Sequence, residues 1–142
     1  MNKKIKKNEI CAPEFLNSPA QYNKSFSRGI KLNFSQSTFL FISGTASIDK
    51  NGKTLYPDNF LRQVQRTFDN IAALLKSERA SWQDIVMTRC YLKDMKNYKS
   101  FNIFRNKYYR DKKIGPFPAS VCVQANLCRS ELEIEIEAIA VL

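Results

Sequence analysis

The sequence contains no histidine and only four glycines among its 142 residues. Histidine is the side chain that most often serves as a general base near neutral pH, and it is a common ligand of zinc and iron. The four glycines, Gly29, Gly44, Gly52 and Gly115, are too few and too dispersed for the loops that hold dinucleotides or nucleotide phosphates. We therefore expect neither a metal nor a cofactor in this protein.

Long apolar runs and paired cysteines are also missing. The longest apolar runs, such as 39–42 and 138–142, are far shorter than the roughly 20 residues that span a bilayer. The basic start is not followed by the apolar segment of a secretion signal. Four cysteines without a C-x-x-C pair, in a chain with no export signal, are typical of reduced thiols. These absences predict a cytoplasmic protein with no membrane span.

Acidic residues are few, and the net charge is +10. Four of the first seven residues are lysines, and we expect residues 1–24 to form a basic tail and loop. The other basic residues are scattered along the chain, which is typical of a hydrated surface. Only the stretch 105–113 interleaves basic and aromatic residues as RNA-binding surfaces do, so we do not expect nucleic acid as a partner.

Hydrophobic periodicity predicts one α+β domain over residues 25–142. Alternating or short apolar runs predict strands at 28–34, 38–43, 84–92, 119–125 and 132–141. Apolar residues at three- and four-residue steps predict helices at 59–77, with Asp58 as N-cap, and at 98–110. Ser81 and Asp84 resemble a capping box. This order favours a mixed sheet with both helices packed on one face.

The other face of the predicted sheet has no helix to cover it. Alternation places Val86, Thr88, Cys90 and Leu92 on one side of the third strand, and Met87, Arg89 and Tyr91 on the other. We expect the uncovered face to carry Arg89, Tyr91, Ser120, Cys122 and the glutamates of the last strand. A face that mixes apolar and charged groups usually meets another subunit, so the sequence predicts an oligomer.

Two groups of residues on that face could support chemistry. Cys122 and Glu135 are expected on neighbouring strands as candidate catalytic residues. A buried carboxylate there could activate water, and the thiol beside it could shape the pocket or act as a nucleophile. Alternatively, Cys122 is an inert core residue and Glu135 a paired surface charge. Arg89 beside Tyr91 could bind a carboxylate through its guanidinium, or form an ion pair with a glutamate at a subunit interface. The residues alone leave these alternatives open.

Several stretches together resemble the Rid family (the YjgF type) from Phe26 to the C-terminus. The matching segments are Phe26–Gly29, Leu40–Gly44, 63–75, Asp84–Val86, Tyr91–Met95, Phe101–Asn102, Phe117–Ala119 and Ile134–Val141. The resemblance implies a chorismate-mutase-like α+β fold and a homotrimer with three clefts between subunits. It also implies cofactor-free hydrolysis of imines and enamines derived from amino acids.

The resemblance also implies roles for particular residues. Glu135 would hold the attacking water, Cys122 would lie in the cleft, and Phe26 would occupy the position of a cleft tyrosine. Ser43 and Gly44 fall in a matching segment and are expected to contact the substrate. In the segment 118–122, Ser120 stands where the family has the arginine that binds the substrate carboxylate. We hypothesise that Arg89 or Arg28 supplies the missing charge.

These implications leave several functions open. The first is hydrolysis of a small carboxylate-bearing metabolite with altered specificity, as an imine or enamine deaminase would perform it. The second is a non-catalytic trimer that binds a small ligand. A third is an RNA-directed role, because some relatives are described as endoribonucleases or translation inhibitors. A fourth rests on a second resemblance, of 26–28 and 42–48 to the chorismate-hydrolysing enzymes.

Overall fold

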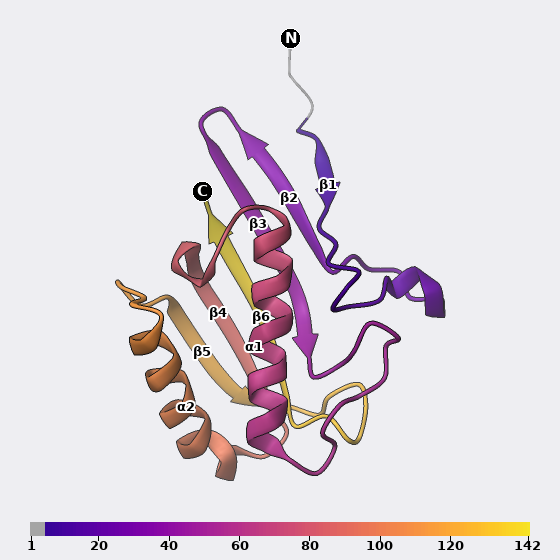
Figure 1. The fold of residues 1–142 in the computed structure, drawn as a ribbon, viewed down its shortest axis with the longest axis vertical. Helices are drawn as coiled ribbons and strands as arrows, with labels where there is room; N and C mark the ends of the chain where they lie inside the picture. Colours follow the sequence, from indigo (N-terminus) through magenta and orange to yellow (C-terminus); the bar gives the residue numbers. More distant parts are fainter. Residues whose placement is uncertain (1–4) are drawn as a thin grey trace.

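The computed structural model describes residues 5–142, in which two long helices pack on a six-stranded sheet (Figure 1). Short 3₁₀ turns occur at Pro19–Tyr22, Trp82–Asp84 and Met95–Asn97. The main elements are β1 (Lys7–Glu9), β2 (Gly29–Phe34), β3 (Ser37–Ala46), α1 (Phe60–Ser77), β4 (Ile85–Leu92), α2 (Tyr98–Asp111), β5 (Ala119–Gln124) and β6 (Ile134–Val141).

The strands follow the order β1-β2-β3-β6-β4-β5 across the sheet. All neighbouring pairs are antiparallel except β4 and β5, which are parallel. The last strand of the chain, β6, therefore lies in the middle of the sheet, between β3 and β4. Both α1 and α2 lie on the same face (Figure 1). The predicted α+β fold, with a mixed sheet and two helices on one face, is confirmed.

An aromatic cluster joins the two helices to each other. Phe68 of α1 is 1% exposed, and its ring stacks on Trp82 with centroids 4.5 Å apart. Three rings from α2 meet Phe68 edge-on, those of Phe101, Phe104 and Tyr108. Because aromatic side chains bury large areas, this cluster is a main source of stability for the helical layer.

Helix α1 begins one residue later than predicted. Its N-cap is Asn59, whose side-chain oxygen accepts a hydrogen bond from the backbone N–H of Arg62. The prediction of Asp58 as N-cap is wrong, since both residues can cap and the sequence pattern does not separate neighbours. The capping box of Ser81 and Asp84 is confirmed.

Two strands carry irregularities that the alternation did not predict. β3 continues through Gly44 to Ala46, and its pairing with β6 shifts register between Ile42 and Thr45. β4 shifts register against β6 between Ile85 and Met87. Val86, predicted on the buried side, lies at this second shift and is 47% exposed. An irregularity of this kind changes the face on which a residue lies without changing the hydrophobic pattern.

Residues 7–24 are more ordered than the predicted tail and loop. Lys7–Glu9 forms β1, an antiparallel edge strand beside β2. Ile10 and Leu16, which follow it, are 0% and 2% exposed and belong to the core. A three-residue strand is too short to show a period, which is why the hydrophobic pattern does not predict it. The lysines at positions 3 and 4 lie outside the described residues.

Candidate functional site

An open cleft of about 890 Å³ lies on the sheet face opposite the helices, where β3 and β6 meet the loops 22–28 and 125–132. Six of the nine predicted site residues line it: Phe26, Arg28, Ser43, Gly44, Tyr91 and Glu135. They come from four separate parts of the chain. The remaining three, Arg89, Ser120 and Cys122, lie elsewhere.

Glu135 places in the cleft a carboxylate that has no side-chain partner in the described part of the chain. It is half-buried in the cleft, and no hydrogen bond or ion pair joins its carboxylate to any other side chain in residues 5–142. Burial is the main cause that raises the pKa of this carboxyl above its ordinary value, and the nearby charge of Glu137 adds to it. A carboxyl in this condition can hold and deprotonate a water molecule.

Gly44 makes room for this carboxylate. A Cβ atom at position 44 would lie 2.9 Å from Cδ of Glu135 and would overlap one of its oxygens. The position of Glu135 over the β3 backbone therefore requires a residue without a side chain. The register shift between Ile42 and Thr45 occurs at the same place. Gly44, which follows the apolar run 38–43, is thus part of the site.

Arg28 brings a buried positive charge to the cleft. It is 5% exposed, and Nε donates to the backbone oxygen of Asn17 at 3.0 Å. Nη2 donates to Asn17 Oδ1 at 2.9 Å and to the Tyr22 hydroxyl at 2.7 Å. Burial lowers the pKa of Arg28, and Tyr22 partly offsets the shift. Within residues 5–142 no carboxylate pairs with Arg28, so its charge is balanced only by neutral acceptors.

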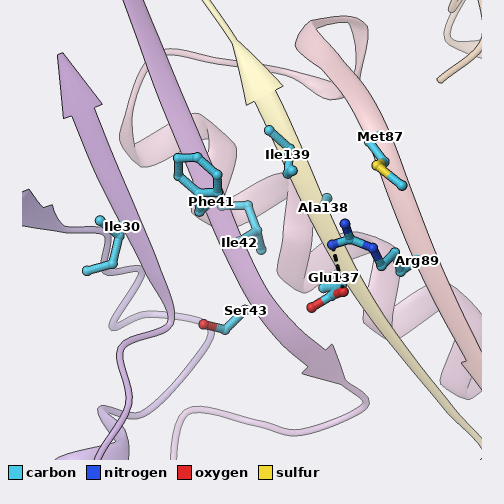
Figure 2. A pocket seen from close by; sticks show the side chains of 9 residues that line it. All are labelled: Ile30, Phe41, Ile42, Ser43, Met87, Arg89, Glu137, Ala138 and Ile139. Carbon is cyan, nitrogen blue, oxygen red and sulfur yellow. Dashed lines mark hydrogen bonds and ion pairs between the residues drawn. The ribbon is translucent and has the colours of Figure 1, made fainter. Parts of the chain in front are cut away.

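Arg89 is neutralised within its own chain. Its Nη1 lies 3.0 Å from Glu137 Oε1, and the Tyr91 hydroxyl donates to the same oxygen at 3.1 Å. Figure 2 shows the guanidinium turned toward Glu137, beside a smaller hollow of about 220 Å³ lined by Phe41, Met87 and others. Burial is the main cause that raises the pKa of Tyr91. The predicted ion pair thus forms, but inside one chain.

Ser120 and Cys122 lie on the helix side of the sheet, and their predicted place on the open face is wrong. β5 pairs in parallel with β4, so that Thr88 faces Ser120 and Cys90 faces Cys122. Cys90 is buried in the core, and Cys122 packs against the core beside it. The residues of β5 are mostly exposed on both faces, so its sequence carries no signal for which side points inward.

Cys122 and Glu135 are therefore not neighbours. β6 lies between β3 and β4, and β4 separates it from β5. Burial raises the pKa of the Cys122 thiol, which keeps it protonated near neutral pH. The alternative in which Cys122 is a small, inert residue at the edge of the core agrees with this placement.

Sequence reasoning missed the loop that closes one side of the cleft. Cys128 and Arg129 line the cleft from this loop between β5 and β6. Arg129 Nη1 donates to the backbone oxygen of Gly52 at 2.7 Å and to Thr54 Oγ1 at 3.1 Å, which ties two loops together. The loop has no hydrophobic period, so only the fold shows that it borders the site.

Comparison with known proteins agrees with this fold. The family described as Endoribonuclease L-PSP matches residues 16–142, nearly the whole chain. The chain belongs to this family. A RutC family protein of Pyrococcus abyssi is 30% identical over 115 residues, 81% of this chain and 84% of the relative. A RutC family protein of Saccharolobus solfataricus is 31% identical over 115 residues, 81% and 85% of the two chains.

Several solved structures have the same fold. Yeast Mmf1 has a TM-score of 0.80 at 24% identity and covers 96% of this chain and 98% of its own. The YjgF gene product of E. coli has a TM-score of 0.76 at 21% identity, with 94% and 98% covered. E. coli TdcF, solved with bound serine, has a TM-score of 0.78 at 19% identity, with 95% and 98% covered. Membership of the Rid (YjgF) family, predicted from the sequence, is confirmed.

The structure also describes the cysteines and the apolar character of the helices. All four cysteines, Cys11, Cys90, Cys122 and Cys128, are free. Over residues 5–142, no helix is both long enough and apolar enough to cross a membrane.

Proposed function

We propose that this L-PSP family member is a cofactor-free hydrolase of imines or enamines derived from small carboxylate-bearing metabolites. The observation that carries the proposal is the Glu135 carboxylate, which is half-buried over Gly44 in a large cleft and has no protein partner within residues 5–142. A carboxyl whose pKa is raised toward neutrality is suited to take a proton from water and return it later.

The reaction needs only water and one acid–base group. With Glu135 as base, the water oxygen attacks the carbon of the C=N bond, and the π electrons move to nitrogen. The proton taken by Glu135 then passes to the nitrogen of the resulting carbinolamine. Glu135 then takes the proton of the carbinolamine hydroxyl as a C=O bond forms and the C–N bond breaks. This proton passes to the departing nitrogen, so that ammonia and a keto acid are released. An imine or iminium carbon is electrophilic enough for this step without a metal, which agrees with a chain that has no histidine.

The substrate is proposed to be a small carboxylate. TdcF, whose fold this chain shares, was solved with serine bound, and serine is a small amino acid with a carboxylate. In this chain Arg28 supplies a positive charge at the cleft, with only neutral partners. A charge buried in this way would favour an anionic ligand.

The cleft is proposed to be completed by further copies of the chain. The open sheet face exposes apolar side chains, with Phe41, Val121 and Val123 between 40% and 44% exposed. A large exposed apolar face usually marks an interface. Assembly as a homotrimer over this face would close the cleft and exclude bulk water from it. We place this protein in the cytoplasm, where such metabolites arise.

The test is a coupled hydrolysis assay. An amino-acid oxidase generates imines from several amino acids, and keto-acid release is followed with and without this protein. We expect acceleration for at least one imine. No acceleration for any of them, from a folded oligomeric sample, would contradict the proposal.

Replacing Gly44 by alanine tests the geometry of the same site. The added Cβ displaces the Glu135 carboxylate without removing it, so we expect hydrolysis to fall at least about tenfold, a part of the roughly 10²–10⁴-fold that a positioned acid–base group contributes. Because the displaced atoms end a flexible side chain, stability should change by less than about 1 kcal/mol. In a Glu135→Gln background the Gly44→Ala change should have no further effect on the rate. Additive losses in the double variant would show that Gly44 acts independently of Glu135.

A second candidate is a trimer that binds a small carboxylate without turning it over. It is favoured by the position of Cys122, which packs on the helix side of the sheet, away from Glu135. In that case the assay shows no acceleration, while a carboxylate ligand still protects the protein against thermal unfolding.

A further inference from the structure

Arg105 of α2 differs from the other arginines near the sheet. Arg89 forms an ion pair, Arg28 is enclosed by Asn17 and Tyr22, and Arg129 is bound to backbone and hydroxyl oxygens. Arg105 Nη1 donates to Ser120 Oγ at 3.2 Å, and Nη2 donates to Asn102 Oδ1 at 2.8 Å. Its guanidinium also lies 5.0 Å from the centre of the Phe101 ring. Three neutral groups thus hold the guanidinium in place.

The charge of Arg105 is not compensated. Within residues 5–142 no carboxylate lies within ion-pair distance of this guanidinium, and the side chain is partly exposed. Each unpaired N–H of a guanidinium can still donate, and a fixed guanidinium binds carboxylates in a two-bond arrangement. Holding the arginine in one geometry beforehand lowers the entropic cost of binding an anion.

Ser120 adds a second donor at the same place. Its hydroxyl oxygen accepts from Arg105 and from Thr88 Oγ1, which is 3.0 Å away. With both lone pairs used in this way, the hydroxyl hydrogen of Ser120 remains as a donor, for which the neighbouring Cys90 sulfur is the competing acceptor. Ser120 is exposed and lies on β5, the outermost strand on this side of the sheet. The hydroxyl and the guanidinium are therefore accessible from the sheet edge.

An apolar surface lies next to these donors. Phe117, just before β5, is 72% exposed, and its ring lies 5.9 Å from that of Tyr109. Tyr109 is one turn of α2 beyond Arg105. The α2–β5 edge thus offers a guanidinium, a hydroxyl donor and an exposed aromatic ring, which together suit a small carboxylate with an apolar group.

We propose that Arg105 and Ser120 bind the carboxylate of a small ligand at the α2–β5 edge, and that one copy presents this edge to the cleft of another. The second part rests on the proposed function. Ser120 and Glu135 lie on opposite faces of the same sheet, so one small ligand cannot contact both within a single chain. An anchor on one copy and the water-holding Glu135 on its neighbour would together hold the ligand.

The binding site is tested by titrating the full-length protein with benzoate, followed by amide chemical shifts in NMR spectra. Wild type should show saturable shifts around Arg105 and Ser120, and neutral benzamide should not. Arg105→Ala should weaken benzoate binding about tenfold or more, as expected for loss of charged hydrogen bonds. The benzoate affinity of Arg105→Lys should lie between those of wild type and Arg105→Ala, because lysine keeps the positive charge but cannot form the two-bond arrangement of a guanidinium. Arg110→Ala, an exposed arginine of the same helix, is the matched control and should bind as wild type does.

Benzoate affinity unchanged in Arg105→Ala, or no saturable binding at this edge in wild type, would overturn the site.

The shared cleft is tested by mixing two inactive variants, Arg105→Ala and Glu135→Gln, after dissociation and reassembly. If the copies assemble at random from an equal mixture, about a quarter of the clefts contain both Arg105 and Glu135. Hydrolysis should then return to about a quarter of the wild-type rate. No recovery, from mixed oligomers confirmed by native mass spectrometry, would overturn the sharing between copies.

Failure of this inference is distinguishable from failure of the proposed function. If Glu135→Gln abolishes hydrolysis while Arg105→Ala leaves both hydrolysis and benzoate binding intact, the function stands and the Arg105 site is overturned. If wild type hydrolyses no imine but binds benzoate through Arg105, the carboxylate site stands and the hydrolase proposal fails.

Discussion

Glu135→Gln is expected to lower imine hydrolysis at least about a hundredfold, the lower end of what a positioned acid–base group contributes. Glutamine keeps the size of the side chain and its place over Gly44, but it cannot accept a proton from water. Glu133→Gln is a suitable control, since Glu133 lies near the start of the same strand, outside the cleft, and pairs with Lys93. A Glu135→Gln variant that hydrolyses imines at the wild-type rate would contradict the assigned role.

The same substitution should stabilise the fold at neutral pH. Burial and the charge of Glu137 raise the pKa of Glu135 above its ordinary value of 4.5, so folding favours its protonated form. As pH rises from 4.5 through the raised value, the unfolded chain has already released this proton, and wild type loses stability. Glutamine carries no such penalty. We expect a gain of about 0.5–2 kcal/mol at pH 7, the range common for single stabilising substitutions.

Urea unfolding of both proteins at several pH values measures this difference. The gap between Glu135→Gln and wild type should shrink as pH falls toward 4.5, because wild type then becomes protonated in both states. A gap that grows with falling pH would show that the Glu135 carboxylate is stabilised in the fold, contrary to the account of the cleft given above.

Phe68→Ala is expected to destabilise the protein by about 3–5 kcal/mol, the usual cost of removing a buried phenylalanine. The ring is 1% exposed and contacts Trp82 and three rings of α2, so its removal leaves a cavity where the two helices meet. Such a loss is a large fraction of the stability of a small domain.

Trp82 is the only tryptophan and stacks on Phe68, so its fluorescence reports on this cluster directly. Unfolding in urea should be compared at equal protein concentration, because the stability of an oligomer depends on concentration. Leu61→Ala, on an exposed position of the same helix, should cost far less. A Phe68→Ala variant that unfolds at the wild-type urea concentration would contradict the central place of this cluster.

The sequence predicted the fold because its most strongly periodic segments form helices and strands in the structure. The stripe of apolar residues in 59–77 gives α1, and the alternation of isoleucine and glutamate in 132–141 gives β6 with its glutamates on the open face. These patterns follow directly from the side chains that must be buried. They also placed Glu135 and Tyr91 on the face where the cleft lies.

Features that depend on pairing between distant strands could not be predicted in this way. Cys122 and Ser120 lie on the helix side because β5 is parallel to β4 and in register with Thr88 and Cys90. No local pattern in β5 encodes that register. Arg105 reaches Ser120 only because α2 lies beside β5, and no local pattern encodes that contact. The sequence alone therefore predicted Arg89 or Arg28 as the replacement arginine.

We propose that Glu135 drives hydrolysis in the cleft over Gly44. The most direct test is the initial rate of keto-acid release from an oxidase-generated imine, measured with wild type, with Glu135→Gln at the same concentration, and without protein. We expect acceleration by wild type and a rate with Glu135→Gln close to that without protein. Equal acceleration by both proteins, or acceleration by neither, would contradict it.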